Sequence, residues 1–594
     1  MRRPLLSWLA AASLLAACAS APSSFTYTAP QQPEAASGLT AKPGWATTKF
    51  AVAAANPLAT DAGYQVLKAG GSAVDAAIAV QMVLALVEPQ SSGIGGGTFL
   101  LHFNGREVEA FDGRETAPAA ADERLFLAAD GKPLPFYEAV VGGRSVGVPG
   151  TLRVLEMAHR QYGKLPWASL FQPAIALAEN GFRVSPRLNT LLKNEAHLAR
   201  DATARSYFFQ ADGEPVAVGA TLRNPELAAV LRRIASEGAR AFYQGEIAQA
   251  IVDKVQRHPS NPGRLALSDL AGYQAKKRAP ICHDYAARGR AWRICGFPPP
   301  SSGAIAVGQI LGILSHTDAA SLPLQGGLPA ADWLHLYTEA ARLAFADRGQ
   351  YLGDPDFVPP PAGRWTSLLD PAYLASRARL IGERSMKAAQ PGTPGARTSR
   401  YAPAAQQVEH GTSHISIVDA YGNGLAMTTT IEDQFGARQM VRGFLLNNEL
   451  TDFSFAPADA QGRPIANRVQ PGKRPRSSMA PTLVFDKATG QLLASAGSPG
   501  GALIIHYTAK TLYGMLNWGL DAQQAIDLPN FGSTNGPTLL EQRRFPPAVV
   551  QALQARGHEV RELDMTSGLQ AIQRTPTGWF GGADPRREGI VLGD

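Results

Sequence analysis

The chain has 594 residues, of which 45% are hydrophobic and 18% are charged, so it can build one large α/β domain or several smaller ones around a substantial core. The net charge of +7 is spread along the sequence, and Pro475 interrupts the densest basic cluster, at 473–476. This distribution argues against a nucleic-acid-binding face. No repeat of fixed period is present, which argues against a solenoid or another repeat architecture.

The N-terminus is typical of an export signal. Two arginines precede an apolar run that is too short for a comfortable membrane span, and small residues follow up to Cys18. Leu-Ala-Ala-Cys at 15–18 resembles a bacterial lipobox, in which the cysteine is lipidated; an ordinary cleaved signal is the alternative. We predict a signal peptide over 1–18, a flexible tether over 19–45, and an exported, periplasmic protein that contacts a membrane only through a lipid anchor.

Regular patterns begin near residue 50. A strand, a helix, a Gly-Gly break and a second helix are predicted in turn. The second helix, 73–87, is apolar nearly all round, which predicts deep burial, and Ser72 and Asp75 form a capping box at its start. Strands follow at SSGIGGGTFLLHFNG and VEAFDGRE. Long helices are predicted over 149–265, and another over 331–352.

Two further cysteines, Cys282 and Cys295, lie symmetrically about an AARG turn in ICHDYAARGRAWRIC. This segment is typical of a hairpin, in which the two side chains would face each other across the strand pair. An exported protein occupies an oxidising compartment, so we expect a disulfide, with two buried thiols as the alternative. Neither this spacing nor the 11 histidines form a metal-ligand pattern, and no metal site is predicted.

A loop rich in Pro, Gly and Ala covers 388–411, and strands begin directly after it. SHISIVDA and GLAMTTTI are joined by a YGN turn, and further strands are predicted at FLLNN, APTLVF and LLASAGS. Helices near 502–518 and 545–556 and two more strands complete the chain. Because strands and helices do not alternate strictly, we expect a layered α+β architecture rather than a doubly wound sheet.

Two glycine motifs suggest other chemistries. Gly93–Gly97 reads GIGGG, but a strand follows where a dinucleotide site needs a helix. Gly143–Gly147 reads GRSVG and matches the nucleophile elbow of a serine esterase, but Val-Pro-Gly separates Ser145 from the following helix. We therefore expect tight turns at both places and keep a serine esterase as the last alternative.

Many ordered segments resemble one family, the γ-glutamyltransferases or glutathione hydrolases of the N-terminal nucleophile superfamily, over about residues 47–594. The resemblance implies a four-layer αββα sandwich and a precursor that cuts itself before a threonine, here Thr412. The two intertwined subunits, 46–411 and 412–594, would then form a heterodimer. The segments that carry the resemblance are AGGSAVDAAIAV, PQSSGIGGGTFLL, DGRETAP, VGVPGT, PPPSSGAIAVGQIL, YLGDPDF, GTSHISIVDAYGN, FLLNNELTDF, KRPRSSMAPTLVF, GSPGGALI and ADPRREG.

Thr412 is therefore the predicted nucleophile. Its hydroxyl needs a base, and cleavage after Gly411 would free an α-amine whose reference pKa of about 7.7–8.0 leaves it partly neutral near pH 7. Thr430 matches a family threonine that orients the nucleophile. Gly500 and Gly501 match the backbone N–H groups of the family's oxyanion hole. The alternative is that Thr412 is an ordinary strand threonine.

The resemblance also implies a receptor for each end of a free α-amino acid. Arg114 matches the residue that clamps the α-carboxylate, a task suited to a planar bidentate guanidinium. Some members of the family carry Asn and Gln where this chain has Glu432 and Glu449, so we expect a more acidic pocket. The other predicted receptors are Ser477 and Ser478 for the carboxylate, and Glu432, Glu449 and Asp452 for the ammonium.

The implied donors are glutathione or other γ-glutamyl compounds, the acceptors are water, amino acids or peptides, and no cofactor is implied. After Phe455 the interval before the SSM motif lacks aromatic residues and looks shorter than in members with an aromatic lid, so we expect a reduced lid and a more open acceptor side. A glutaryl- or cephalosporin-type acylase of the same superfamily is the nearest alternative, and it would not need the ammonium receptors. A catalytically silent, surface-anchored binding protein is another.

Overall fold

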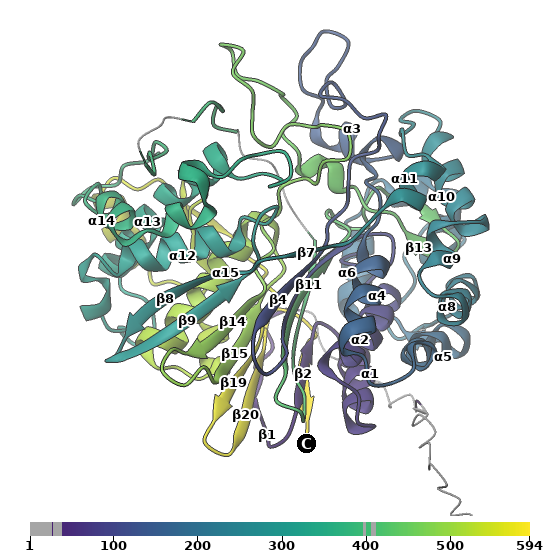
Figure 1. Cartoon of the computed structure of the whole chain (residues 1–594), viewed down its shortest axis with the longest axis horizontal. Helices are drawn as coiled ribbons and strands as arrows, with labels where there is room; N and C mark the ends of the chain where they lie inside the picture. Colours follow the sequence, from purple (N-terminus) through teal and green to yellow (C-terminus); the bar gives the residue numbers. More distant parts are fainter. Residues whose placement is uncertain (1–26, 28–37, 396–398, 405–410) are drawn as a thin grey trace, which may run out of the picture.

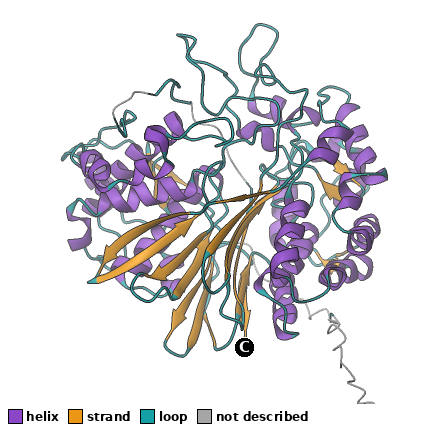
Figure 2. Ribbon diagram, viewed as in Figure 1, coloured by secondary structure: helices purple, strands orange, loops and turns teal. Residues whose placement is uncertain are grey.

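The computed structural model describes residues 27, 38–395, 399–404 and 411–594. Two seven-stranded sheets lie face to face, and helices cover the outer face of each (Figures 1 and 2). The predicted α+β class and four-layer αββα order are therefore confirmed. Cys18, the predicted signal peptide and most of the predicted tether lie outside the described residues. In the part of the chain that is described, no helix is both long and apolar enough to cross a membrane.

The two predicted catalytic threonines lie at neighbouring ends of the two central strands of one sheet, Thr412 just before β10 and Thr430 at the end of β11. β10 and β11 pair antiparallel across the predicted YGN turn, and β2 and β3 flank them. Because β2 and β3 precede residue 411 and β10 and β11 follow it, the two predicted fragments share this sheet (Figure 1). Its strands in spatial order are β21 (Ile590–Gly593), β2 (Ala51–Ala54), β10 (Ser413–Val418), β11 (Gly424–Thr430), β3 (Gly97–Phe103), β4 (Val108–Gly113) and β7 (Lys276–Arg278).

The second sheet also contains strands from both predicted fragments. β8 and β9 form the predicted hairpin, which pairs Cys282 with Cys295, and the two sulfur atoms are bonded at 2.07 Å. The sequence predicted two strands after the helix near 545–556, whereas the structure has four, β18 to β21. The strands of the second sheet in spatial order are β1 (Trp45–Thr47), β20 (Gly578–Ala583), β19 (Gln570–Thr575), β15 (Leu492–Gly497), β14 (Thr482–Asp486), β9 (Arg290–Gly296) and β8 (Ile281–Ala287).

The helices that lie over the first sheet all precede residue 280 (Figure 1). The long helices predicted over 149–265 are a series of shorter ones, because Gly and Pro interrupt the apolar pattern, as at Gly181 and Gly238. These helices are α1 (Pro57–Lys68), α2 (Ala73–Val87), α4 (Thr151–Tyr162), α5 (Gln172–Asn180), α6 (Pro186–Lys193), α7 (Ala202–Phe208), α8 (Pro225–Glu237), α9 (Arg240–Tyr243), α10 (Glu246–Gln256) and α11 (Leu267–Gly272), with α3 (Phe136–Val140) above them in the view.

The helices over the second sheet come from both sides of residue 411. They are α12 (Gly303–Leu314), α13 (Ala331–Tyr351), α14 (Pro371–Ala378), α15 (Ile504–Tyr513), α16 (Ala522–Asp527) and α17 (Pro547–Ala555). The remaining strands form small sheets of two or three: β5 (Phe182–Arg183) with β6 (Thr221–Leu222), β12 (Met440–Val441) with β13 (Phe444–Leu445), and β16 (Phe531–Gly532) with β17 (Thr538–Glu541) and β18 (Val560–Leu563).

Helix α2 packs against the two central strands of the first sheet, β10 and β11. All its residues are buried, and the predicted capping box is present, with Ser72 accepting from the N–H of Asp75 at 3.2 Å and Asp75 accepting from that of Ser72 at 2.9 Å. The strands behind it alternate their side chains between two cores, so that Leu100 faces the helices while Phe99 stacks on Phe297 of the sheet interface. Burial on both sides fixes the register of the sheet.

Candidate active site

Thr412 immediately precedes β10 and lies against the end of β11. Its Oγ1 donates a hydrogen bond to Oγ1 of Thr430 at 3.1 Å, and Thr430 also accepts the N–H of Glu432 at 2.8 Å. The backbone nitrogen of Thr412 donates to the carbonyl of Ser91 at 3.2 Å. Only 3% of Thr412 is exposed. The structure thus places the predicted nucleophile beside its predicted orienting partner and holds both its hydroxyl and its nitrogen.

The backbone around the predicted scissile bond is unusual. Gly411 has φ 70° and Thr412 has φ 94°, a left-handed conformation that β-branched residues rarely adopt. A Cβ on Gly411 would lie 1.9 Å from the carbonyl oxygen of Glu432, so only glycine fits there. Such a conformation at Thr412 costs about 1–3 kcal/mol, and breaking the bond before Thr412 would release it.

A small pocket beside Thr412 combines residues from both predicted fragments. Its volume is about 10 Å³, room for roughly one water molecule, so the uncut chain leaves no space for a γ-glutamyl group. Every predicted catalytic and substrate-binding residue except Gly500 belongs to the lining. The lining residues are Arg114, Thr412, Thr430, Glu432, Glu449, Asp452, Ser477, Ser478, Met479, Gly501 and Ile504.

Arg114 follows β4 and is fully buried. Its Nε donates to the carbonyl of Pro475 at 3.1 Å and one terminal nitrogen donates to that of Arg476 at 3.0 Å. The two terminal nitrogens also contact the carboxylates of Glu449 and Asp452. Burial acts to lower the pKa of Arg114, but the neighbouring carboxylates raise it above its usual value. A ligand carboxylate therefore meets a permanent cation that is already bonded to two backbone carbonyls and two carboxylates of the protein.

Three buried carboxyl groups lie next to this guanidinium, because Glu115 joins Glu449 and Asp452, and Glu432 lines the same pocket. Burial and then repulsion from neighbouring carboxylates raise the pKa of Glu432 well above its usual value. Burial, opposed by Arg114, does the same to the pKa of Glu449. Burial raises the pKa of Glu115 to about 8 against the pull of Arg114. The ionised forms of these carboxyl groups are therefore disfavoured in the empty pocket, and a bound ammonium group would favour them.

Replacing Glu115 by glutamine is expected to change the pH dependence of donor binding. Glu115 is protonated at pH 7, so Glu115→Gln should stay within about threefold of wild-type kcat/KM there. Above pH 8 the wild-type side chain ionises 3.9 Å from Arg114, which weakens the hold of Arg114 on a donor carboxylate. KM for a γ-glutamyl anilide should therefore rise from pH 7.5 to 9.5 more steeply in the wild type than in the variant.

The same shift has a consequence for stability. The folded state keeps a proton on Glu115 that the unfolded chain releases above its ordinary pKa of 4.5, so the wild type loses stability as the pH rises from there to about 8. Glu115→Gln lacks this loss of stability.

Parallel pH profiles of KM in the wild type and in Glu115→Gln would contradict the assignment of the raised pKa to Glu115. Glu107→Gln, at an exposed position near β4, is the matched control.

Ser477 and Ser478 precede β14 and present hydroxyls to the pocket. Oγ of Ser478 accepts a hydrogen bond from Arg348 at 2.6 Å, and Oγ of Ser477 accepts the N–H of Met479 at 3.1 Å. In each case the hydroxyl proton is left to donate to a ligand. Arg348, on α13, also donates to Oγ of Ser302 at 2.9 Å, and no local sequence pattern marks this residue.

Gly500 and Gly501 stand where the turn after β15 enters a short 3₁₀ helix, η8 (Gly501–Leu503), which continues into α15. Their φ angles are 128° and 57°, and a Cβ on Gly500 would lie 2.5 Å from the ring of Tyr507. No hydrogen bond within the described part of the chain uses either N–H as donor. N–H groups of this kind at a helix N-terminus suit a developing oxyanion.

The two glycine motifs contribute to this pocket in an unexpected way. Asn447 donates to the carbonyls of Gly95 at 2.7 Å and Gly147 at 2.9 Å, and its Oδ1 accepts the N–H of Glu449 at 3.0 Å. Asn447 thereby ties both turns to the 3₁₀ helix η7 (Glu449–Asp452), which carries two of the carboxylates. A buried asparagine that joins motifs far apart in sequence gives no local signal, so Asn447 could not be predicted from the sequence.

Ser145 does not form a nucleophile elbow. It ends a 3₁₀ turn, η1 (Gly143–Ser145), and its Oγ donates to the carbonyl of Val140 at 2.6 Å. The next helix, α4, starts only at Thr151. The expectation of a tight turn at GRSVG is confirmed, and the serine-esterase alternative has no support from this geometry.

One cluster within the described residues could ligate a metal ion, and it lies outside the pocket lining. It consists of His335 and Glu339 on α13 and His558 after α17. Nδ1 of His335 lies 2.8 Å from Nε2 of His558, Nε2 of His335 lies 2.8 Å from the carbonyl of Gly382, and Glu339 accepts from Arg342 at 2.6 Å. These protein partners satisfy the buried polar atoms without an ion.

Comparison with known proteins identifies the family of this chain. The family model described as gamma-glutamyltranspeptidase matches residues 59–593. The chain is 37% identical over 557 residues to a glutathione hydrolase proenzyme of Bacillus subtilis (strain 168), with 91% of each chain covered, and 36% identical over 546 residues to that of Escherichia coli (strain K12), with 90% of each covered. The crystal structure of a cephalosporin acylase from Bacillus halodurans, 28% identical, matches with a TM-score of 0.79 and covers 96% of this chain and 98% of its own. The chain belongs to the gamma-glutamyltranspeptidase family of N-terminal nucleophile hydrolases.

Proposed function

We propose that this protein cuts its own chain between Gly411 and Thr412, and that the new N-terminal Thr412 transfers γ-glutamyl groups from glutathione or related compounds to water, amino acids or peptides. One observation carries the proposal: the paired hydroxyls of Thr412 and Thr430 share a pocket with Arg114 and three carboxylates. That arrangement suits an amide whose far end is a free α-amino acid. The word proenzyme in the names of both relatives fits a chain that matures by cleavage.

The proposed reaction uses the α-amine of Thr412 as the base. The amine takes the Oγ1 proton as Oγ1 bonds to the γ-carbonyl carbon, and the oxyanion forms beside the N–H groups of Gly500 and Gly501. The C–N bond then breaks, the proton passes to the leaving amine, and a γ-glutamyl ester remains on Oγ1. Water or an acceptor amine attacks this ester with the same base, which releases the product and restores Thr412.

Donor recognition follows from a guanidinium and a group of carboxyl side chains that lie next to one another in the pocket. Arg114 and the hydroxyls of Ser477 and Ser478 would bind the α-carboxylate. The α-ammonium would lie among the carboxyl groups of the pocket, where its charge favours their ionised forms and offsets the repulsion between them. These receptors are Glu432, Glu449 and Asp452.

An acylase acting on glutaryl-type amides is the second candidate, because the solved structure reported above, which covers 96% of this chain, is a cephalosporin acylase. A glutaryl amide has the carboxylate but no ammonium, so it would leave the three carboxylates without a cation. We expect the processed protein to show at least about 100-fold higher kcat/KM for a γ-glutamyl anilide than for the glutaryl anilide. Equal or faster turnover of the glutaryl anilide would favour the acylase, and turnover of simple esters alone would favour neither.

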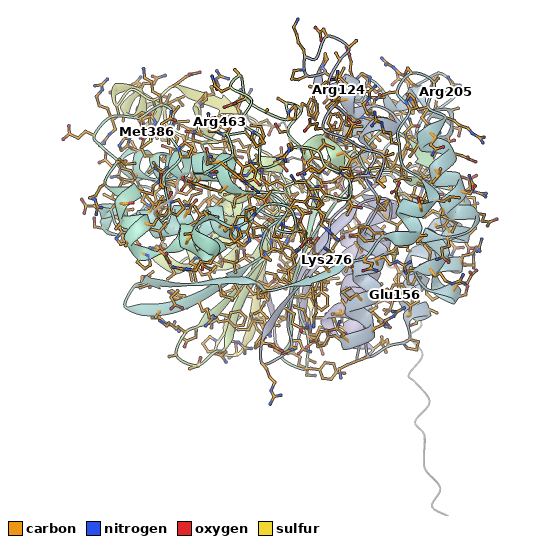
Figure 3. All side chains as sticks on the ribbon, turned by 45° about the horizontal axis from the view of Figure 1, so that its top comes forward. Arg124, Glu156, Arg205, Lys276, Met386 and Arg463 are labelled. Atoms are coloured by element: carbon orange, nitrogen blue, oxygen red, sulfur yellow. A yellow bond between two sulfur atoms is a disulfide. The ribbon has the colours of Figure 1, made fainter. Side chains whose placement is uncertain are left out.

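We propose an open acceptor side because the interval after Phe455 lacks aromatic residues up to the SSM motif, and residues 456–464 are half-buried or exposed. The ring of Phe455 stacks on Phe126 with centroids 4.6 Å apart, and the N–H of Ala402 bonds the carbonyl of Pro464 at 3.0 Å. Arg124 lies in the loop that contains Phe126, and Arg463 lies in the loop that contains Pro464. Both arginines are labelled in the upper half of Figure 3. Turnover of bulky γ-glutamyl amides as well as glutathione is expected, and complete rejection of the bulky amides would exclude an open side.

Export and lipidation at Cys18 are proposed from the sequence alone. A Cys18→Ser variant should move from the membrane fraction to the soluble fraction of the producing cells. An unchanged distribution would argue against the anchor.

A further inference from the structure

Arg587 contacts the backbone of the proposed nucleophile rather than its side chain. One terminal nitrogen donates to the carbonyl oxygen of Thr412 at 3.3 Å, and the side chain packs against Gly568, where a Cβ would lie 2.8 Å from its Cδ. Only 4% of Arg587 is exposed, and its Nε has no hydrogen-bond partner among the described residues. A buried guanidinium with a single backbone acceptor calls for an explanation, because burying this charge is costly.

The surroundings of Arg587 form a charged cluster that spans both proposed fragments. Glu88, at the end of α2, accepts the hydroxyl of Ser413 at 3.3 Å and lies 3.7 Å from Arg187. The N–H of Arg187 in turn donates to Glu588 at 2.9 Å. The charged or titratable groups that face Arg587 are Glu88, Arg187, Asp584 and Tyr507, and those that share the pocket with Thr412 are Arg114, Glu432, Glu449 and Asp452.

We propose that Arg587 is a positioning residue for the mature nucleophile: it holds the carbonyl of Thr412 and places a positive charge beside the amine that cleavage releases. This inference rests on the proposed function, in which that amine is the base. The contacted carbonyl and the amine belong to one residue, so the guanidinium stands within about 7 Å of the amine. A cation at that distance disfavours the ammonium form and keeps the base neutral.

The acidity of this pocket makes such a cation useful. Gly411 packs on the carbonyl of Glu432, so an acidic side chain belongs to the residue next to the new terminus. The pKa of Glu432 is raised well above its usual value, so its ionised form grows with rising pH, and that form would favour a protonated amine, which cannot accept the Oγ1 proton. Arg587 acts in the opposite direction. Burial lowers the pKa of Arg587 to about 9, which still leaves it charged at neutral pH.

The test compares three variants of the full chain after self-cleavage. Arg587→Gln removes the charge, Arg587→Lys keeps it, and Arg187→Gln removes a neighbouring charge that does not touch Thr412. The readout is the pH profile of kcat/KM for a γ-glutamyl anilide from pH 5.5 to 9.5, whose acidic limb reports the base in the free enzyme. We expect the limb to move up by about one pH unit in Arg587→Gln and by less than about 0.3 unit in the other two.

Several outcomes would overturn this role. In Arg587→Gln, kcat/KM could fall equally at every pH while the acidic limb stays in place. That result would show a purely structural role for Arg587. An equal shift in Arg187→Gln would assign the effect to the cluster as a whole. If Arg587→Gln is not cleaved, Arg587→Lys carries the test, and an uncleaved Lys variant or one whose limb moves by a full unit contradicts the proposal. Failure of the wild-type chain to cleave or to act on the anilide concerns the proposed function instead and is measured first.

Discussion

Replacing Thr412 by alanine is expected to lower kcat/KM for a γ-glutamyl anilide by at least about 10⁴-fold. The variant lacks the Oγ1 atom that bonds Thr430, and without cleavage it also lacks the free amine. The pocket of the uncut chain has room for about one water molecule, so residual binding cannot compensate. Release of the chromogenic anilide at high enzyme concentration measures the loss.

Thr412→Ser is the matched control. It keeps the hydroxyl and the future amine but lacks the β-methyl group that restricts χ1. We expect it to cleave and to retain activity within about 100-fold of the wild type, because the hydroxyl then samples more directions. An alanine variant with more than about 1% of wild-type activity would mean that the nucleophile is another residue.

Arg114→Leu is expected to lower kcat/KM by about 10³-fold, mainly through a higher KM. The donor loses a bidentate, charge-assisted contact to its α-carboxylate, and such bonds contribute about 1.5–3 kcal/mol each. Glu449 and Asp452 also lose their shared cation in a fully buried site. Leaving buried charges without a partner costs about 3–5 kcal/mol, so the unfolding temperature should fall as well.

Arg114→Lys separates these two effects. Lysine restores a positive charge for the carboxylates but cannot form the planar fork. Stability should therefore recover more than KM does when thermal unfolding and steady-state kinetics are measured on the same preparations. Wild-type KM in either variant would show that the donor carboxylate binds elsewhere.

The local elements of this fold could be predicted because their signals are local. The strand pair around the YGN turn and the capping box at Ser72 need only neighbouring residues to form. The sequence predicts longer helices over 149–265 than the structure has, because an apolar pattern continues across glycines at which helices end, such as Gly181 and Gly238. The sequence also contained too little pattern to separate β18 from the strands that follow it, since the side chains of β18 are largely exposed.

The members of the site came from the resemblance rather than from local pattern, and their mutual contacts came only from the structure. A sequence shows Arg114 and Glu449 as separate charged residues that would ordinarily be exposed. Their ion pair depends on a carboxylate 335 positions away being brought to the same pocket. Glu115 and Arg587 were missed for the same reason, because nothing in DGRETAP or ADPRREG indicates which charge is buried.

Denaturing intact-mass analysis of the purified wild-type protein beside Thr412→Ala tests the central claim most directly. We predict two fragments in the wild type, with the boundary between Gly411 and Thr412, and one continuous chain in the variant. A wild-type chain that stays whole under all maturation conditions, or that is cut at another bond, would contradict the assignment of Thr412 as a self-generated N-terminal nucleophile.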